Sequence, residues 1–185
     1  SLLPFHEELQ NPKLSQKFID VGSGCGFPGL AIAIAIPNSY ITLLDSSNKK
    51  TNFLKEVSKE IGLSSRIKVV TERAESAGKN RIFRGCFDYA IARAVAPATV
   101  VAEYLVPFLN STGQALIYKG SWNETEQQIL KKALTELNAE TKQTHNFVLP
   151  DDRGIRNIIR ICSNKKCPNQ YPRSIGKPKR QPLGY

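Results

Sequence analysis

Hydrophobic residues recur along this chain with two spacings, one typical of strands and one typical of helices. Short apolar or alternating runs predict five successive strands, at 18–21, 41–45, 66–70, 87–92 and 113–118. Apolar residues spaced three and four apart predict helices between and after them, at 30–36, 48–61, 97–109 and 124–137. Two further runs, at 143–149 and 155–162, predict an antiparallel hairpin at a sheet edge.

The alternation of strands and helices defines the expected fold class. Strands separated by helices favour right-handed βαβ units, which place parallel strands in one sheet and helices on both of its faces. With the terminal hairpin, the pattern predicts an α/β domain built on a mainly parallel seven-stranded sheet with an antiparallel edge. Ligands of such sheets bind beyond the carboxyl ends of the strands.

Composition narrows the class of protein. The chain has 185 residues, 41% of them hydrophobic, which fits one globular domain. It contains no apolar run of membrane-spanning length and no signal-peptide pattern, so we expect no membrane partner. Four scattered cysteines favour a reducing compartment, and we expect a cytoplasmic protein, or a stromal one in a plant plastid. Because methionine is absent even at position 1, we expect a fragment or a processed chain.

The net charge of +10 is concentrated near the carboxyl terminus. Residues 1–152 carry 17 Lys/Arg against 16 Asp/Glu, whereas residues 153–185 carry 9 Lys/Arg and no acid. The segment after Cys162 is also rich in proline and glycine and has no periodicity. We therefore predict a structured domain over 18–162 and a basic, flexible tail over 163–185.

A glycine loop follows the first predicted strand. Glycines at 22, 24 and 26 let the backbone bend with φ above zero and let a ligand approach closely. The next residues, 27–29, open an apolar helix whose first N–H groups would point into the same crevice. Strand, loop and helix together predict a cofactor site.

Two cofactors fit the loop pattern. Residues 24–29 match G-x-G-x-x-G, which keeps a nicotinamide-dependent oxidoreductase open. The loop also reads D-x-G-x-G-x-G from Asp20, the pattern of S-adenosylmethionine-dependent methyltransferases. A carboxylate at Asp20 would repel a pyrophosphate and suit a cationic cofactor, so we favour S-adenosylmethionine.

Polar residues follow the later strands at the same predicted edge. Asp45 ends the second strand 19 residues after Gly26, where a carboxylate typically accepts both ribose hydroxyls of an adenosine cofactor. Ser46 and Ser47 lie beside it, as ribose contacts or as N-caps of the next helix. The segment 73–75 follows the third strand, where it would border the adenine or form a solvated loop.

Two cations follow the fourth and fifth strands. Arg93 stands between two alanines, so we expect it to face the pocket rather than solvent, and Lys119 closes the fifth strand in a similar place. We find no pattern for a catalytic nucleophile. We expect no metal site either, because Cys162 and Cys167 have no second Cys/His pair to complete a tetrahedral set.

Taken together, these motifs resemble the RsmG (GidB) family of methyltransferases that modify small-subunit ribosomal RNA. The resemblance rests on D-V-G-S-G-C-G-F-P-G (20–29), L-L-D-S-S-N-K-K (43–50), E-R-A-E (72–75), F-D-Y-A-I-A-R-A (87–94) and Y-K-G (118–120). The run Y-P-R-S-I-G-K-P-K-R-Q-P-L-G (171–184) is similar to the ending of cyanobacterial and plastid members. The family normally has a helical segment before the sheet, and residues 1–17 look like a remnant of that cap.

The resemblance implies a Rossmann-like class I methyltransferase that transfers a methyl group to N7 of a guanine in 16S ribosomal RNA. Guanine N7 has no proton to lose, so no residue is required as a general base, and Arg93 and Lys119 are candidates at the reacting end. The implied cofactor-binding residues are Asp20, Gly22, Gly24, Gly26, Phe27, Asp45, Ser46, Ser47, Ala74, Glu75 and Arg93.

Ribosomal RNA is the expected partner of the basic tail, either as 16S RNA or as the assembled small subunit, and the protein is expected to be a monomer. Cations without acids engage RNA phosphates by counterion release. The candidate RNA-binding residues are Arg153, Arg156, Lys165, Lys166, Arg173, Lys177, Lys179 and Arg180. A non-catalytic RNA-binding or ribosome-assembly module remains a third hypothesis.

Overall fold

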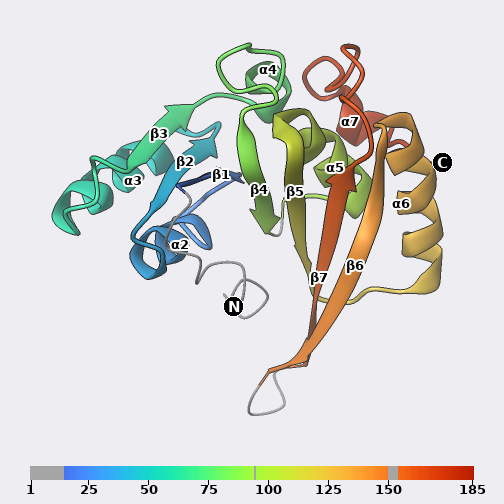
Figure 1. Ribbon diagram of the computed structural model, residues 1–185, viewed down its shortest axis with the longest axis horizontal. Helices are drawn as coiled ribbons and strands as arrows, with labels where there is room; N and C mark the ends of the chain where they lie inside the picture. Colours follow the sequence, from blue (N-terminus) through green and yellow to red (C-terminus); the bar gives the residue numbers. More distant parts are fainter. Residues whose placement is uncertain (1–14, 94, 150–153) are drawn as a thin grey trace.

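The computed structural model describes residues 15–93, 95–149 and 154–185 (Figure 1). Two earlier predictions fall outside these residues: positions 1–14 of the cap remnant expected at 1–17, and Arg153.

One seven-stranded sheet organises the molecule, with the strand order β3-β2-β1-β4-β5-β7-β6 (Figure 1). Strands β1 to β5 pair in parallel, and β7 runs antiparallel to both β5 and β6. The strands are β1 Gln16–Val21, β2 Ser39–Asp45, β3 Ile67–Thr71, β4 Phe87–Arg93, β5 Leu109–Lys119, β6 Ala139–Val148 and β7 Ile155–Ser163. This confirms the predicted α/β fold with an antiparallel edge hairpin.

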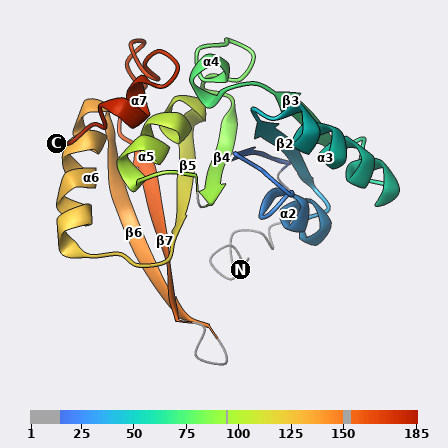
Figure 2. The ribbon, with the colours of Figure 1, turned by 180° about the vertical axis from the view of Figure 1, so that it is seen from behind.

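Helices cover both faces of the sheet. The helices are α2 Gly29–Ala35, α3 Asn48–Glu60, α4 Ala74–Ala77, α5 Ala98–Leu105, α6 Glu124–Glu136 and α7 Lys177–Arg180, with a 3₁₀ turn η2 at Val106–Phe108. Helices α2 and α3 contribute to one hydrophobic cluster, whereas α5 and α6 contribute to another. Figure 2 shows α5 lying over β4 and β5 on the second face.

Alternate residues of each central strand supply the two clusters, because successive side chains of a strand point to opposite faces. Phe18 packs with the α2 and α3 cluster, and its neighbour Ile19 packs with the α5 and α6 cluster. Leu116 and Ile117 of β5 divide in the same way. Both faces of β1 and β5 are therefore buried, which explains their continuous apolar runs.

The carboxyl-terminal segment corrects one prediction. Residues 163–185 were expected to form a flexible tail, but Cys167, Tyr171 and Leu183 are buried in the cluster that contains α5 and α6. The segment packs along these helices, and the carboxyl terminus lies beside α6 (Figure 1). Its few apolar residues are too widely spaced to show periodicity, so the sequence pattern missed their burial.

Candidate functional site

The glycine loop, residues 20–29, connects β1 to α2. Gly22 and Gly26 have φ angles of +73° and +96°, a region that side chains other than glycine rarely adopt. A Cβ on Gly26 would lie 2.3 Å from Leu30 Cδ1 and 3.1 Å from Leu54 Cδ2. These glycines are therefore needed for the bend itself and for close packing of the loop against α2 and α3.

The buried side chain of Asp20 anchors this loop from inside the protein. It is 1% exposed, and its Oδ2 accepts a hydrogen bond of 2.9 Å from the Gly29 N–H, which links the end of β1 to the start of α2. Burial raises the pKa of Asp20 to about 7, although the Gly29 hydrogen bond and the charge of Arg93 oppose that rise. Burial thus favours the neutral acid.

This position weakens the argument drawn from the charge of Asp20. The residue does not line the cavity beside the loop, and its buried carboxyl has a raised pKa, so repulsion by Asp20 is a weak argument against a phosphate-bearing cofactor there. The preference for S-adenosylmethionine has to rest on other evidence.

Asp45 fixes the loop to the end of β2. Its Oδ2 accepts from the Gly24 N–H at 3.0 Å and its Oδ1 accepts from the Ser47 N–H at 2.9 Å, while Lys50 Nζ lies 3.8 Å from Oδ2. The residue is 6% exposed and lies in the wall of a cavity. Since each oxygen of an ionised carboxylate has two lone pairs, Asp45 can accept further hydrogen bonds.

This cavity, which we call the glycine-loop cavity, has a volume of about 290 Å³ at the carboxyl ends of β1, β2 and β4. Of the predicted cofactor-binding residues it brings together Gly22, Asp45, Ser46, Ala74, Glu75 and Arg93. The others lie outside its lining, namely Asp20, Gly24, Gly26, Phe27 and Ser47. Gly24 and Ser47 instead hold Asp45 in place through their backbone N–H groups.

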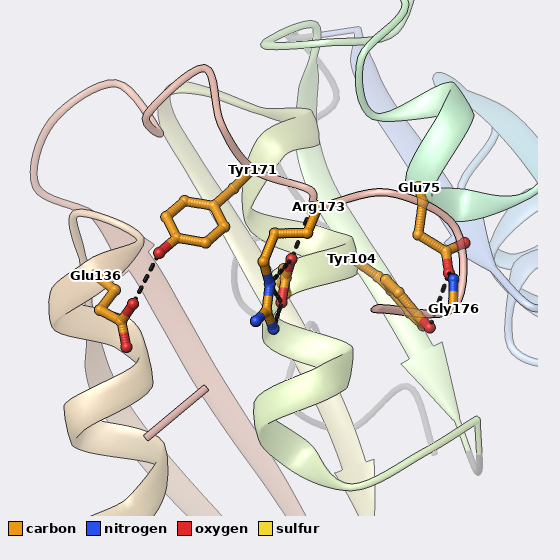
Figure 3. Close-up of polar contacts among 7 residues, drawn as sticks. Glu75, Tyr104, Glu136, Tyr171, Arg173 and Gly176 are labelled. Atoms are coloured by element: carbon orange, nitrogen blue, oxygen red, sulfur yellow. Dashed lines mark hydrogen bonds and ion pairs between the residues drawn. The ribbon is translucent and has the colours of Figure 1, made fainter. Parts of the chain in front are cut away.

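Glu75 forms part of the wall that α4 contributes. It is 5% exposed, and its Oε1 accepts from the Tyr104 hydroxyl at 3.3 Å and from the Gly176 N–H at 3.0 Å (Figure 3). Burial, and then the charge of Glu75, raise the pKa of Tyr104, so the phenol keeps its proton and remains a donor. Glu75 therefore joins α4, α5 and the carboxyl-terminal segment at one point.

A second cavity, which we call the hairpin cavity, has a volume of about 870 Å³ and lies beyond the ends of β4 and β5, beside the β6–β7 hairpin. Arg93 lines both cavities. Lys119 lines the hairpin cavity, but its Nζ is held 2.8 Å from Glu126 Oε1 of α6. The two cations predicted at the reacting end thus reach the same cavity, although Lys119 is already paired.

The predicted RNA-binding residues that the structure describes lie at several different places in the fold. Arg156 lines the hairpin cavity, Lys165 and Lys166 are exposed near the start of the tail, and Lys179 lines the glycine-loop cavity. Arg173 is bound to Glu103 inside the fold, with 2.6 Å between its Nη2 and Oε2. Two of the three guanidinium nitrogens of Arg173, Nε and Nη2, are bound to Glu103, which argues against the RNA-contact role predicted for this residue.

Sequence reasoning missed several residues of the glycine-loop cavity. Lys50 and Glu72 lie within the resembling segments but were given no role, and Arg73 was considered only as part of the segment 73–75, which would border the adenine or form a solvated loop. Tyr104 reaches the cavity from the second half of α5 rather than from the segment directly after β4, and Lys179 reaches it from α7 near the carboxyl terminus. Their positions depend on helix packing, for which the sequence carries no local signal.

Within residues 15–93, 95–149 and 154–185, no group of three or more His, Cys, Asp or Glu residues is arranged to hold a metal ion. No described helix has both the length and the apolar content needed to cross a membrane.

The fold is shared with solved methyltransferase structures. One is the TrmK protein of M. capricolum, described in complex with S-adenosylhomocysteine. It matches with a TM-score of 0.63 at 15% identity, and the match covers 88% of this chain and 68% of the TrmK chain. Another is magnesium protoporphyrin IX methyltransferase from Synechocystis, described with bound SAM. It matches with a TM-score of 0.65 at 14% identity, and the match covers 88% of this chain and 76% of that enzyme's chain. At these identities the likeness concerns the fold.

Sequence comparison is more specific. A ribosomal RNA small subunit methyltransferase G of Prochlorococcus marinus (strain NATL2A) is 80% identical over 185 residues, which are all of this chain and 75% of that protein. Its counterpart in Parasynechococcus marenigrum is 51% identical over 184 residues, with 74% of that protein covered. Residues 2–158 match the family profile described as GidB, rRNA small subunit methyltransferase G. The chain therefore belongs to the GidB family.

Proposed function

We propose that this chain is an S-adenosylmethionine-dependent methyltransferase of the cytoplasm that methylates N7 of a guanine in 16S ribosomal RNA. Family membership supports the activity, since the relatives are named as small-subunit ribosomal RNA methyltransferases. The observation that carries the proposal is the pair of adjoining cavities with Arg93 in both linings. One cavity would hold the methyl donor and the other the base.

The glycine-loop cavity fits the adenosine part of the donor. Asp45 retains acceptor capacity for two ribose hydroxyls, and Ser46 lies beside it. A Cβ on Gly22 would lie 2.8 Å from Val95 Cγ2, so only glycine leaves the loop this close to the segment after β4. Ala74 and Glu75 form the wall that the resemblance assigns to the adenine.

The hairpin cavity fits a base drawn from RNA. It contains the aromatic residues Tyr118 and Phe147 together with aliphatic side chains, which suit the apolar faces of a purine. Arg156 lies in the same lining, where a guanidinium can pair with phosphate. This arrangement provides a place for the base and a place for the backbone that carries it.

The proposed chemistry requires no residue as a general base. When bound, the donor supplies a methyl group on a sulfonium, and the N7 lone pair forms the new N–C bond while the electrons of the C–S bond return to sulfur. No proton leaves guanine, so the residues serve to bind and orient. Holding two reactants in line contributes most of the effect in such a reaction.

The test is transfer of a labelled methyl group to small ribosomal subunits and to naked 16S RNA, followed by mapping of the modified nucleotide. We expect label at N7 of one guanine. Asp45→Asn provides the matched variant, because it removes the charge with little change in shape, and we expect it to lose most of the transfer.

Two results would contradict the proposal. Binding of NAD without binding of S-adenosylhomocysteine in calorimetry would indicate an oxidoreductase. Binding of RNA without methyl transfer, at saturating donor, would indicate a non-catalytic module.

A further inference from the structure

The C-terminal strap, residues 167–184, is fastened to the domain by side chains from distant segments. Arg84 donates to the carbonyl oxygens of Tyr171, Cys167 and Pro168 at 2.6, 2.9 and 3.0 Å. A guanidinium presents five donors in a fixed fork, so one side chain can hold several carbonyls together. Arg84 thereby fixes the beginning of the strap against the segment that precedes β4.

A buried ion pair fixes the middle of the strap. Arg173 Nε donates to both carboxylate oxygens of Glu103, at 2.9 and 3.1 Å, and Nη2 donates to Oε2 at 2.6 Å (Figure 3). The backbone N–H of Arg173 also donates to Oε1 of Glu103, at 2.8 Å. Glu103 is completely buried on α5, so its charge depends on the strap for compensation.

A third attachment brings the strap to the glycine-loop cavity. The Gly176 N–H donates to Glu75 Oε1, and Glu75 lies in the cavity wall. Helix α7 begins at the next residue, and Lys179 of this helix also lies in that wall. Figure 3 shows Glu75, Tyr104 and Gly176 gathered at one point between α4, α5 and the strap.

We propose that Lys179 binds the methyl donor and that the C-terminal strap forms a wall of the donor site. The inference rests on the proposed function, since it assumes that the glycine-loop cavity holds the donor. A lysine ammonium offers three donors and no acceptor, so it complements the ring nitrogens and oxygens of the donor. Because the strap meets the wall at Glu75, we place the contact on the adenosine half.

This assignment replaces the earlier expectation that all the strap cations bind RNA. Lys177 and Lys179 belong to the same short helix and are both exposed, yet Lys179 lines the glycine-loop cavity and Lys177 does not. The two residues have equal charge and nearly equal position in the sequence. They form a matched pair that separates donor binding from a general effect of positive charge.

The experiment is calorimetric titration of S-adenosylhomocysteine into the unmodified chain, Lys179→Ala and Lys177→Ala. We expect Lys179→Ala to bind about tenfold more weakly, as for a lost hydrogen bond from a charged donor. Lys177→Ala should bind within about twofold of the unmodified chain, since its charge is screened by solvent. Equal affinities in all three proteins would overturn the assignment of Lys179.

5′-Methylthioadenosine, which lacks the amino-acid half, locates the contact. A loss of affinity for this compound similar to that for S-adenosylhomocysteine supports the adenosine assignment, whereas a loss for S-adenosylhomocysteine alone refutes it. Hydrogen exchange of the unmodified chain supplies a readout that needs no variant. We expect S-adenosylhomocysteine to slow exchange at the backbone N–H groups within residues 176–180, of which Pro178 has none.

The outcomes separate this inference from the proposed function. If the unmodified chain binds S-adenosylhomocysteine but exchange in residues 176–180 is unaffected and Lys179→Ala binds normally, only the strap inference fails. If the unmodified chain does not bind S-adenosylhomocysteine at all, both fail.

Discussion

The glycine loop and the C-terminal strap border the same cavity from distant parts of the chain, yet they are held in different ways. The loop depends on backbone conformation, because Gly22 and Gly26 adopt positive φ angles within a few residues of each other. The strap depends on side chains that lie far away in sequence. Gly176 bonds to Glu75 across 101 residues, and Arg173 bonds to Glu103 across 70.

The difference explains why one region is visible in the sequence and the other is not. A glycine requirement is local, so it leaves a pattern of fixed spacing. A long-range ion pair leaves no pattern, since neither partner predicts the position of the other. In the sequence the strap therefore resembles a basic tail, although Arg173 compensates the charge of the buried Glu103. Three substitutions, in order of expected effect, test whether the two regions differ in this way.

Replacing Arg173 with alanine should have the largest effect on stability. Among the described residues, the buried carboxylate of Glu103 then keeps only the backbone N–H of residue 173 as a hydrogen-bond donor. Breaking a buried pair by removing one member costs about 3–5 kcal/mol of unfolding free energy. Urea unfolding measures the change. Lys177→Ala is the control and should change stability by less than about 0.5 kcal/mol. A loss under about 1 kcal/mol for Arg173→Ala would mean that the pair does not hold the strap.

Replacing Gly26 with alanine tests the loop in the same assay. The new Cβ would meet Leu30 and Leu54 in a region with φ of +96°, so we expect a loss of about 2–4 kcal/mol from backbone strain and overpacking. Gly24→Ala is the matched control. At Gly24 the nearest atom to a Cβ is 3.8 Å away and only the φ of +57° is unfavourable, so about 1 kcal/mol is expected. Equal losses at both positions would contradict the packing role of Gly26.

Replacing Asp20 with asparagine tests a buried side chain that anchors the loop through the Gly29 N–H. The pKa of Asp20 is raised from 3.8 to about 7 by burial, so between these values the folded chain keeps a proton that the unfolded chain releases. This contribution therefore destabilises the fold increasingly as pH rises from about 4 to 7, by up to about 1.4 kcal/mol per pH unit. Asp20→Asn cannot ionise, so it should gain stability relative to the unmodified chain over that range. Parallel pH profiles of unfolding free energy would refute the shift.

The fold was largely predictable because its signals are local. The expected strand at 87–92 corresponds to β4 at Phe87–Arg93, and the expected helix at 124–137 corresponds to α6 at Glu124–Glu136. The hairpin was also expected, and β7 lies at Ile155–Ser163 as predicted, although β6 begins at Ala139, four residues before the predicted run at 143–149. Hydrophobic spacing determines these elements, since each must bury one or both faces.

The site was predictable only in part. Asp45 reaches the cavity because the end of β2 lies beside the glycine loop in any sheet of this order. Asp20 belongs to the same motif, but its side chain is buried and accepts from the Gly29 N–H instead of lining the cavity. Tyr104 lies in α5, whose apolar sequence predicts only a buried core helix. Its hydrogen bond to Glu75 depends on how the fold places α5 beside α4.

The sequence by itself determined the order of strands and helices, the bend after β1 and the family. These follow from hydrophobic period, glycine spacing and motif, which act over a few residues. Only the tertiary structure decided that the cationic carboxyl-terminal segment is a folded strap, that Arg173 compensates a buried Glu103, and that Lys179 lies at the cavity. The physical reason is that a charge has no fixed partner until packing brings one within reach and removes the water between them.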